Sequence, residues 1–157
     1  MKPDNHGPLP AEELLRILKP PPARRAQTPE IQSALVMQKW LKKNGFFVRR
    51  IQNRLDVMWD VPNRLAAEIC FKDGFCTLKI KLAARGAAEQ LTVRLHEING
   101  CLSGGCLFPD VNTGEIYFRQ TTFYGETAMT IAHCQTVVNS CADAVAQCRA
   151  WLKDAIE

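Results

Sequence analysis

The sequence predicts an α+β domain in which an antiparallel β-sheet packs against helices. Two hairpin turns, Asp73-Gly74 and Asn112-Thr113-Gly114, each lie between short segments of β-type composition. The last thirty residues instead repeat apolar side chains every three or four positions, which is the period of a helix with one buried face. With a helix before the first strands and another between the hairpins, the expected order of elements is α-β-β-β-β-α-β-β-α.

The first helix of this domain has clear start and stop signals. Thr28 is a suitable N-cap, Pro29 fits the first helical position, and Gly45 ends the helix after Asn44. Most of its apolar residues share one side: Ile31, Ala34, Leu35, Met37 and Leu41. This side is expected to pack on the sheet.

A second apolar patch on the same helix predicts a further contact. Val36 and Trp40 are four residues apart and lie nearly opposite the main apolar side, flanked by Lys39 and Lys43. An ordinary surface helix carries one apolar stripe, so a second patch requires a second surface to cover it. We therefore predict a protein contact at these four residues.

Four β-type segments follow, over residues 46–51, 54–61, 66–72 and 75–82. With Lys72 opposite Phe75, the central hairpin places apolar pairs on one face and mostly polar side chains on the other. The apolar pairs are Phe71–Cys76, Ile69–Leu78 and Ala67–Ile80. This alternation predicts a sheet with one buried face and one more polar face.

The second half of the chain adds a helix over residues 88–99, strands over 106–111 and 115–121, and a closing helix from about residue 127. The closing helix carries an apolar stripe over three heptads, made of Ile131, Cys134, Val138, Cys141, Val145, Cys148 and Leu152. The stripe is widened by Val137, Ala144 and Trp151. We expect this stripe to be buried.

Residues 1–30 form an N-terminal arm, and residues 31–157 form a single α+β domain. The arm contains a short amphipathic segment with Leu14 and Leu18, stopped by Pro20-Pro21-Pro22, and is expected to be mobile or docked on the domain. The start of the chain lacks the apolar stretch of a signal peptide, and no run of eighteen apolar residues occurs. The sequence thus predicts a cytoplasmic protein without a membrane contact.

The seven cysteines are an odd number and lie mostly within regular elements, which favours reduced thiols. Cys134, Cys141 and Cys148 share one helix face but are two turns, or about 10 Å, apart, which is too far for one metal ion. We interpret these three as buried apolar residues. Cys101 and Cys106 keep a thiol or metal protein open as a second alternative.

No combination of residues predicts catalysis. Ser103 lacks the G-x-S-x-G context of a nucleophile, and the glycines around it are not followed by the Lys-Ser/Thr of a phosphate loop. We therefore predict no catalytic residue, no cofactor and no enzymatic activity.

A basic cluster over residues 39–54 gives the first alternative function, the binding of nucleic acid or of an acidic partner. It contains Lys39, Lys42, Lys43, Arg49, Arg50 and Arg54. Residues 61–157 hold nine basic and ten acidic residues, and this balance makes a dedicated nucleic-acid binder the less favoured interpretation. Arg49 and Arg50 are therefore added to the predicted protein contact.

From about Gln38 to Asp154 the chain resembles the YbjN-like family of proposed bacterial sensory-transduction regulators, which share the fold of type III secretion chaperones. The matching features are the helix end Trp40-Leu41-Lys42-Lys43-Asn44-Gly45-Phe46, the central hairpin, Leu95-His96-Glu97-Ile98-Asn99-Gly100, the strand pair from Cys106 to Arg119, and the closing helix. The resemblance implies a sheet packed against helices, often in a dimer, with a surface that binds another polypeptide. It implies no cofactor and no catalytic residue.

Together these observations predict a non-enzymatic protein-binding module, chaperone-like or regulatory, that binds itself as a homodimer, a client polypeptide, or both. The predicted contact surface consists of Val36, Trp40, Lys39, Lys43, Arg49 and Arg50. A sheet edge is a further expected place for an extended client strand.

Overall fold

The structure, a computed structural model, describes residues 27–59, 65–82 and 88–156, with side chains from Leu91 to Leu152 in the last range. The predicted arm, up to residue 26, lies outside the described residues. The elements are α2 (Pro29–Lys43), β1 (Phe47–Ile51), β2 (Arg54–Met58), β3 (Ala66–Lys72), β4 (Phe75–Lys81), α3 (Ala88–Cys101), β5 (Cys106–Pro109), β6 (Ile116–Phe123) and α4 (Ile131–Ile156). Their order confirms the predicted α+β arrangement.

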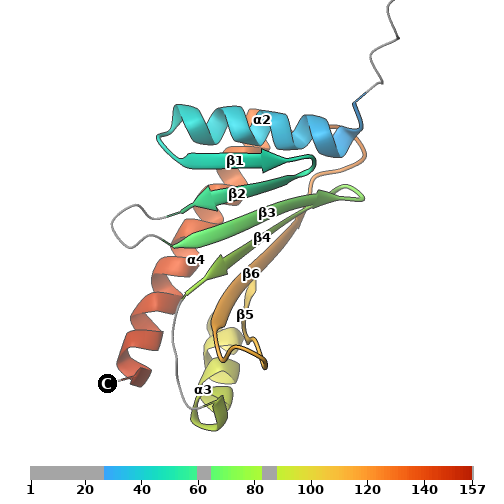
Figure 1. Cartoon of the computed structure of the whole chain (residues 1–157). Coiled ribbons are helices and arrows are strands. Elements are labelled where there is room, and N and C mark those ends of the chain that lie inside the picture. Colours follow the sequence, from blue (N-terminus) through green and yellow to red (C-terminus); the bar gives the residue numbers. More distant parts are fainter. Residues whose placement is uncertain (1–26, 60–64, 83–87, 157) are drawn as a thin grey trace, which may run out of the picture.

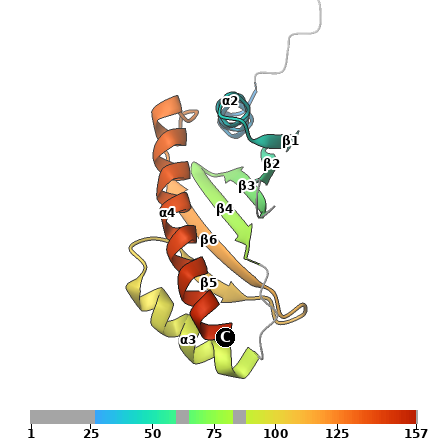
Figure 2. The same ribbon diagram turned by 90° about the vertical axis from the view of Figure 1, so that its left-hand side faces the viewer.

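The strands form one antiparallel sheet in the order β1-β2-β3-β4-β6-β5. Helix α4 crosses one face of the sheet, with α2 beside β1 and α3 beside β5 (Figure 2). Figure 1 looks onto the opposite face, which no helix of the described residues covers. We call this opposite side the open face.

The register predicted for the central hairpin is confirmed. Ala67 pairs with Ile80, Ile69 with Leu78, and Phe71 with Cys76, and all six side chains are buried beneath the helices. The turn residues Asp73 and Gly74 have φ values of 51° and 78°, as a tight two-residue hairpin requires. The core thus lies between the sheet and α4, where Cys141 and Val145 are buried as well.

The predicted ends of α2 are also confirmed. Thr28 Oγ1 accepts a hydrogen bond from the backbone N–H of Ile31, at 3.4 Å, and Gly45 leaves the helix with a φ of 85°. Lys42 and Lys43 lie in the last turn, where cations interact favourably with the helix dipole. Two of the six residues in the basic cluster, Lys42 and Lys43, therefore have a structural role at the end of α2.

The closing helix begins later than predicted. Thr130 Oγ1 accepts a hydrogen bond from the N–H of His133, at 3.3 Å, so the N-cap is Thr130 and not a residue near 127. The segment before it is tied to α2, because the buried Ser33 Oγ accepts a hydrogen bond from the N–H of Met129 at 2.9 Å. Ile131, predicted to be in the buried stripe, is 59% exposed, since this first turn of α4 lies beyond the sheet. The other six residues of the stripe are buried.

Other boundaries differ by a few residues. The second strand ends at Met58 rather than at residue 61. The fifth ends at Pro109, because the Asp110 carboxylate accepts hydrogen bonds from the N–H groups of Asn112 and Thr113 and so starts the turn. The sixth runs on to Phe123 because it pairs with β4 along its whole length.

One side chain closes the free edge of β5. The Asn99 amide donates to the backbone carbonyl of Leu107 at 2.9 Å, and its oxygen accepts from the N–H of the same residue at 2.6 Å. Asn99 thus stands in for a neighbouring strand. At Leu107 the edge of β5 therefore already has its hydrogen-bond partners, and the expectation that a client strand adds to a sheet edge stays a prediction.

Candidate functional site

A groove runs between α2 and α4 on the helical side of the molecule. It consists of two adjoining hollows of about 550 and 610 Å³, which share Trp40, Asn44 and Gln135. The exposed surface of the first hollow is mainly apolar, with Val36, Trp40, Met129 and Ile131 in its lining. The second hollow exposes slightly more polar than apolar surface, although its lining includes Phe46, Trp59, Leu65, Val138 and Val145. We call this feature the α2–α4 groove.

Among the described residues, the charged side chains that line the α2–α4 groove are cations. Lys39 and Lys43 belong to the first hollow and Arg149 to the second, and no aspartate or glutamate of the described ranges lines either hollow. The amides of Asn44, Gln135 and Asn139 add hydrogen-bonding groups. The groove is therefore suited to an apolar segment with carboxylates at its border.

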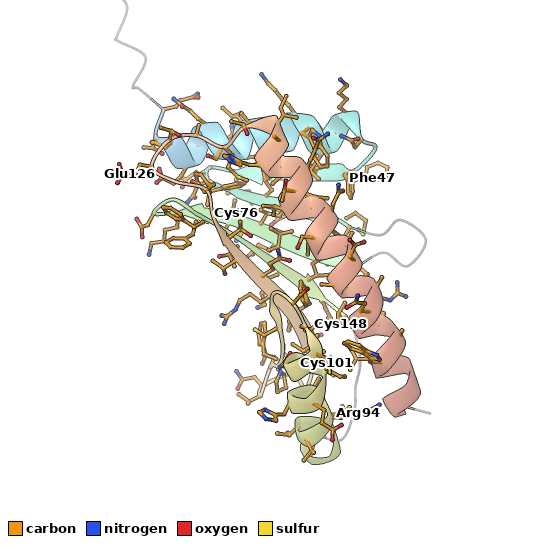
Figure 3. All side chains as sticks on the ribbon, turned by 180° about the vertical axis from the view of Figure 1, so that it is seen from behind. Phe47, Cys76, Arg94, Cys101, Glu126 and Cys148 are labelled. Carbon is orange, nitrogen blue, oxygen red and sulfur yellow. The ribbon has the colours of Figure 1, made fainter. Side chains whose placement is uncertain are left out.

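The structure brings together four of the six residues predicted to contact a partner. Val36, Trp40, Lys39 and Lys43 all line the first hollow, and the two apolar side chains are half-buried. Figure 3 shows this helical side, with α4 in front of the sheet.

Arg49 and Arg50 do not join them. Arg49 lies on the open face, where its guanidinium is 2.9 Å from the Asp56 carboxylate. Arg50 points to the helical side and donates to the backbone carbonyl of Gln52 at 2.8 Å, which holds the β1–β2 turn. Since a strand alternates its side chains between two faces, adjacent arginines could not share a surface.

The basic cluster over residues 39–54 is thus not one patch. Its lysines lie on α2, whereas Arg49 and Arg54 lie on the open face beside Asp56 and Glu68. The distances from Arg54 to these two carboxylates are 3.3 and 3.6 Å. Most of the positive charge from Arg49 and Arg54 is therefore neutralised locally.

Sequence reasoning missed the opposite wall of the groove. Ile131 and Gln135 come from α4, and Phe46 and Trp59 come from the ends of the first hairpin. Their proximity to Trp40 follows from tertiary packing alone. No sequence signal indicated this wall, because Ile131 continues the helical period of a stripe that was expected to be buried.

The cysteines of α4 are core residues, as predicted. Cys134, Cys141 and Cys148 are buried, and the resulting desolvation raises their thiol pKa values to about 11, 12 and 11. Burial also raises the pKa of the Cys76 thiol. Cys101 at the end of α3 is exposed, and Cys106 is half-buried. Figure 3 shows Cys101 and Cys148 on their separate helices.

Because these thiols are buried, the protein is expected to lose stability at alkaline pH. The pKa of each is 9.0 when exposed in the unfolded chain and higher in the fold, so the unfolded state releases protons first. The free energy of unfolding should not depend on these groups below pH 9 and should fall as pH rises from 9 towards 11–12. At pH 10 the loss is about 1 kcal/mol for each buried thiol. Urea unfolding at pH 8 and at pH 10 measures this loss. The difference between the two free energies of unfolding should be smaller for Cys148→Ala than for the unchanged protein.

Within the described residues, no group of three or more histidine, cysteine, aspartate or glutamate side chains is placed to hold a metal ion. No helix in the described ranges is long and apolar enough to cross a membrane.

Comparison with solved structures is informative about the fold. No family model matches the chain, and no curated protein matches it. Among solved structures, the chain is similar to YbjN from E. coli, described as a proposed transcription regulator, with a TM-score of 0.56 over 76% of this chain and 87% of that one. The chain has a YbjN-like fold.

The sequence identity to YbjN is 14%, so the likeness establishes the fold and not a shared activity. It confirms the predicted YbjN-like arrangement of an antiparallel sheet and helices. The feature most particular to the resemblance, Ile98-Asn99 before a strand, also has a physical role in this YbjN-like fold: Ile98 is buried and Asn99 closes the edge of β5.

Proposed function

We propose that this chain is a non-enzymatic polypeptide-binding module, regulatory or chaperone-like, that uses the α2–α4 groove. The observation that carries the proposal is a groove with an apolar first hollow around Trp40, in which the charged lining residues of the described ranges are cations. The fitting ligand is an amphipathic helix or extended segment with acidic residues beside its apolar side chains. The YbjN-like fold and its regulatory neighbour support a binding module rather than an enzyme.

We further propose that a second copy of the chain occupies the groove, giving a homodimer. Trp40 at the centre of the groove is an aromatic residue of the kind that dominates protein interfaces, and Ile131 across from it is 59% exposed in a single chain. Covering both side chains would remove apolar surface from water.

The dimer is tested by light scattering on a sizing column at several protein concentrations. We expect the mass of two chains for the unchanged protein and of one chain for Trp40→Asp, which places a carboxylate in the apolar groove. Lys42→Asp is the matched control, because Lys42 lies on the same helix outside both hollows. A single-chain mass for the unchanged protein would remove the homodimer from the proposal.

The groove itself is tested by tryptophan fluorescence. Trp40 and Trp59 both line it, so an occupant should shift their emission towards shorter wavelengths. An acidic amphipathic helical peptide is expected to cause this shift, and Lys39→Glu with Lys43→Glu should weaken its binding at least tenfold. Equal binding of a basic peptide of the same apolar pattern would contradict the assignment of the groove.

A further inference from the structure

The open face of β4, β6 and β5 has an unusual composition. Its outward side chains on β4 are Phe75, Thr77, Lys79 and Lys81, which alternate with the buried Cys76, Leu78 and Ile80. Opposite them on β6 lie Phe123, Thr121, Arg119 and Tyr117, and β5 adds Cys106 and Phe108. These positions hold four aromatic rings, three cations and no carboxylate. We call this surface the β4–β6–β5 strip.

The other half of the open face is different. On β1, β2 and β3, Arg49 and Arg54 lie within 4 Å of Asp56 or Glu68, so cations and carboxylates largely cancel. Lys81, at the end of the strip, pairs with Glu115 just before β6. Among the described residues, Lys79 and Arg119 make no ion pair within 4 Å, although Glu68 on β3 lies directly opposite Lys79.

Lys79 and Arg119 lie directly opposite each other across β4 and β6. Like charges in this arrangement repel and lower the stability of a sheet. They are held by rings instead of by carboxylates: the Lys79 Nζ lies 4.2 Å from the centre of the Tyr117 ring, and the Arg119 guanidinium lies 5.4 Å from that of Phe108. Two adjacent cations on an exposed surface form a place for an anion.

Aromatic pairs stand at both ends of this cation pair. The centres of the Phe75 and Phe123 rings are 5.1 Å apart. Phe75 is 44% exposed and Phe123 is 63% exposed. At the other end, the Phe108 and Tyr117 rings are stacked at 5.6 Å. The six steps along β4 from position 75 to position 81 separate the two pairs by about 20 Å. Between them, the Thr77 and Thr121 hydroxyls lie 3.0 Å apart.

We propose that the β4–β6–β5 strip binds single-stranded nucleic acid. Unpaired bases stack on exposed rings, as they do on the sheet surfaces of other single-strand binders, and backbone phosphates bind the cations between the rings. The rings and the cations lie in one row along β4 and β6, and this row is long enough for several nucleotides. The basic cluster over residues 39–54 plays no part in this proposal.

An acidic polypeptide would also be attracted to Lys79 and Arg119. The alternation of rings, cations and rings along the strip favours the nucleic acid, because each nucleotide offers both a flat base and a phosphate. A carboxylate-rich segment has no comparable partner for two pairs of rings.

The test is fluorescence anisotropy of a labelled twelve-nucleotide single strand, either (dT)12 or (rA)12, titrated with the full chain. Binding should weaken with salt, with a log–log slope of about −1.4 for the two phosphate contacts made by Lys79 and Arg119. Lys79→Ala with Arg119→Ala should lower the affinity at least tenfold and reduce the slope. Phe123→Ala should lower the affinity about fivefold to a hundredfold with little change in slope, since it removes stacking and no charge.

Two controls separate this surface from the α2–α4 groove and from charge in general. Arg49→Ala with Arg54→Ala removes the same number of charges from the other half of the open face and should leave oligonucleotide binding within about twofold. Trp40→Asp, which disrupts the groove, should also leave it unchanged. All these positions are at least partly exposed, and a thermal melt of each variant confirms that it folds.

Three results would overturn the proposal. One is the absence of oligonucleotide binding at low salt. Another is binding that is insensitive to Lys79→Ala with Arg119→Ala. The third is binding of polyglutamate, and not of the oligonucleotides, with the same dependence on these two residues, which would assign the strip to an acidic protein partner.

Discussion

Gly105→Ala is expected to lower the free energy of unfolding by about 2–4 kcal/mol. Gly105 has a φ of 75°, and a Cβ there would lie 2.5 Å from the ring of the fully buried Phe118 and 2.8 Å from the carbonyl oxygen of Arg119. The left-handed backbone costs an alanine about 1 kcal/mol, and forcing an extra methyl group into a packed site costs about 1–3 kcal/mol more. Urea unfolding followed by circular dichroism measures the change.

Gly114→Ala is the matched control. Gly114 has a similar φ of 68°, but a Cβ there would meet nothing within 4 Å. The cost should therefore be the backbone cost alone, about 1 kcal/mol. Equal losses for the two variants would show that the chain does not approach Phe118 at Gly105 as closely as described.

Asn99→Ala is expected to lower the free energy of unfolding by about 1–3 kcal/mol. The substitution removes both hydrogen bonds to the backbone of Leu107, a residue whose side chain is buried, and leaves its N–H and carbonyl without those partners. It also uncovers the edge of β5 for pairing with another chain. We therefore expect light scattering to show larger assemblies at high protein concentration as well as a lower unfolding midpoint.

Asn99→Asp distinguishes the two hydrogen bonds. The carboxylate still accepts from the N–H of Leu107, but its second oxygen faces the carbonyl of the same residue instead of donating to it. The loss of stability should be at least as large as for alanine. An aspartate variant as stable as the unchanged protein would mean that Asn99 makes only one of the two bonds.

Most of the fold could be predicted from the sequence because its signals are local. The Asp73-Gly74 turn fixes the register of the central hairpin, since both residues accept the left-handed backbone that such a turn needs. The spacing of Cys134, Cys141 and Cys148 marks the buried side of α4 in the same way. These patterns depend on backbone geometry within a few residues and need no knowledge of distant contacts.

The boundaries that failed depend on side chains making particular hydrogen bonds. The prediction that α4 begins near residue 127 was wrong because Thr130 caps the helix. Ile131 continues the helical period of the stripe, yet it is exposed because the sheet does not extend beneath that turn. Periodicity shows which side of a helix is apolar, but not how far the partner surface reaches.

Of the two candidate surfaces, only one wall of the α2–α4 groove could be predicted from the sequence. The Val36–Trp40 patch indicated one wall of the α2–α4 groove, because two apolar residues opposite the main stripe violate the pattern of an ordinary helix. The other wall comes from Met129, Ile131 and Trp59, far away in the chain. The β4–β6–β5 strip could not be found at all, since it depends on the pairing of residues 75–81 with residues 117–123.

That pairing has a consequence for the chain as it leaves the ribosome. Strand β4 is translated well before β6, and the intervening α3 and β5 must emerge first. Until then the nascent sheet of β1–β4 exposes a row of unpaired amide and carbonyl groups along β4, next to the apolar Leu78 and Ile80. Until β6 is available, the free edge of β4 is therefore open to mispairing with neighbouring nascent chains.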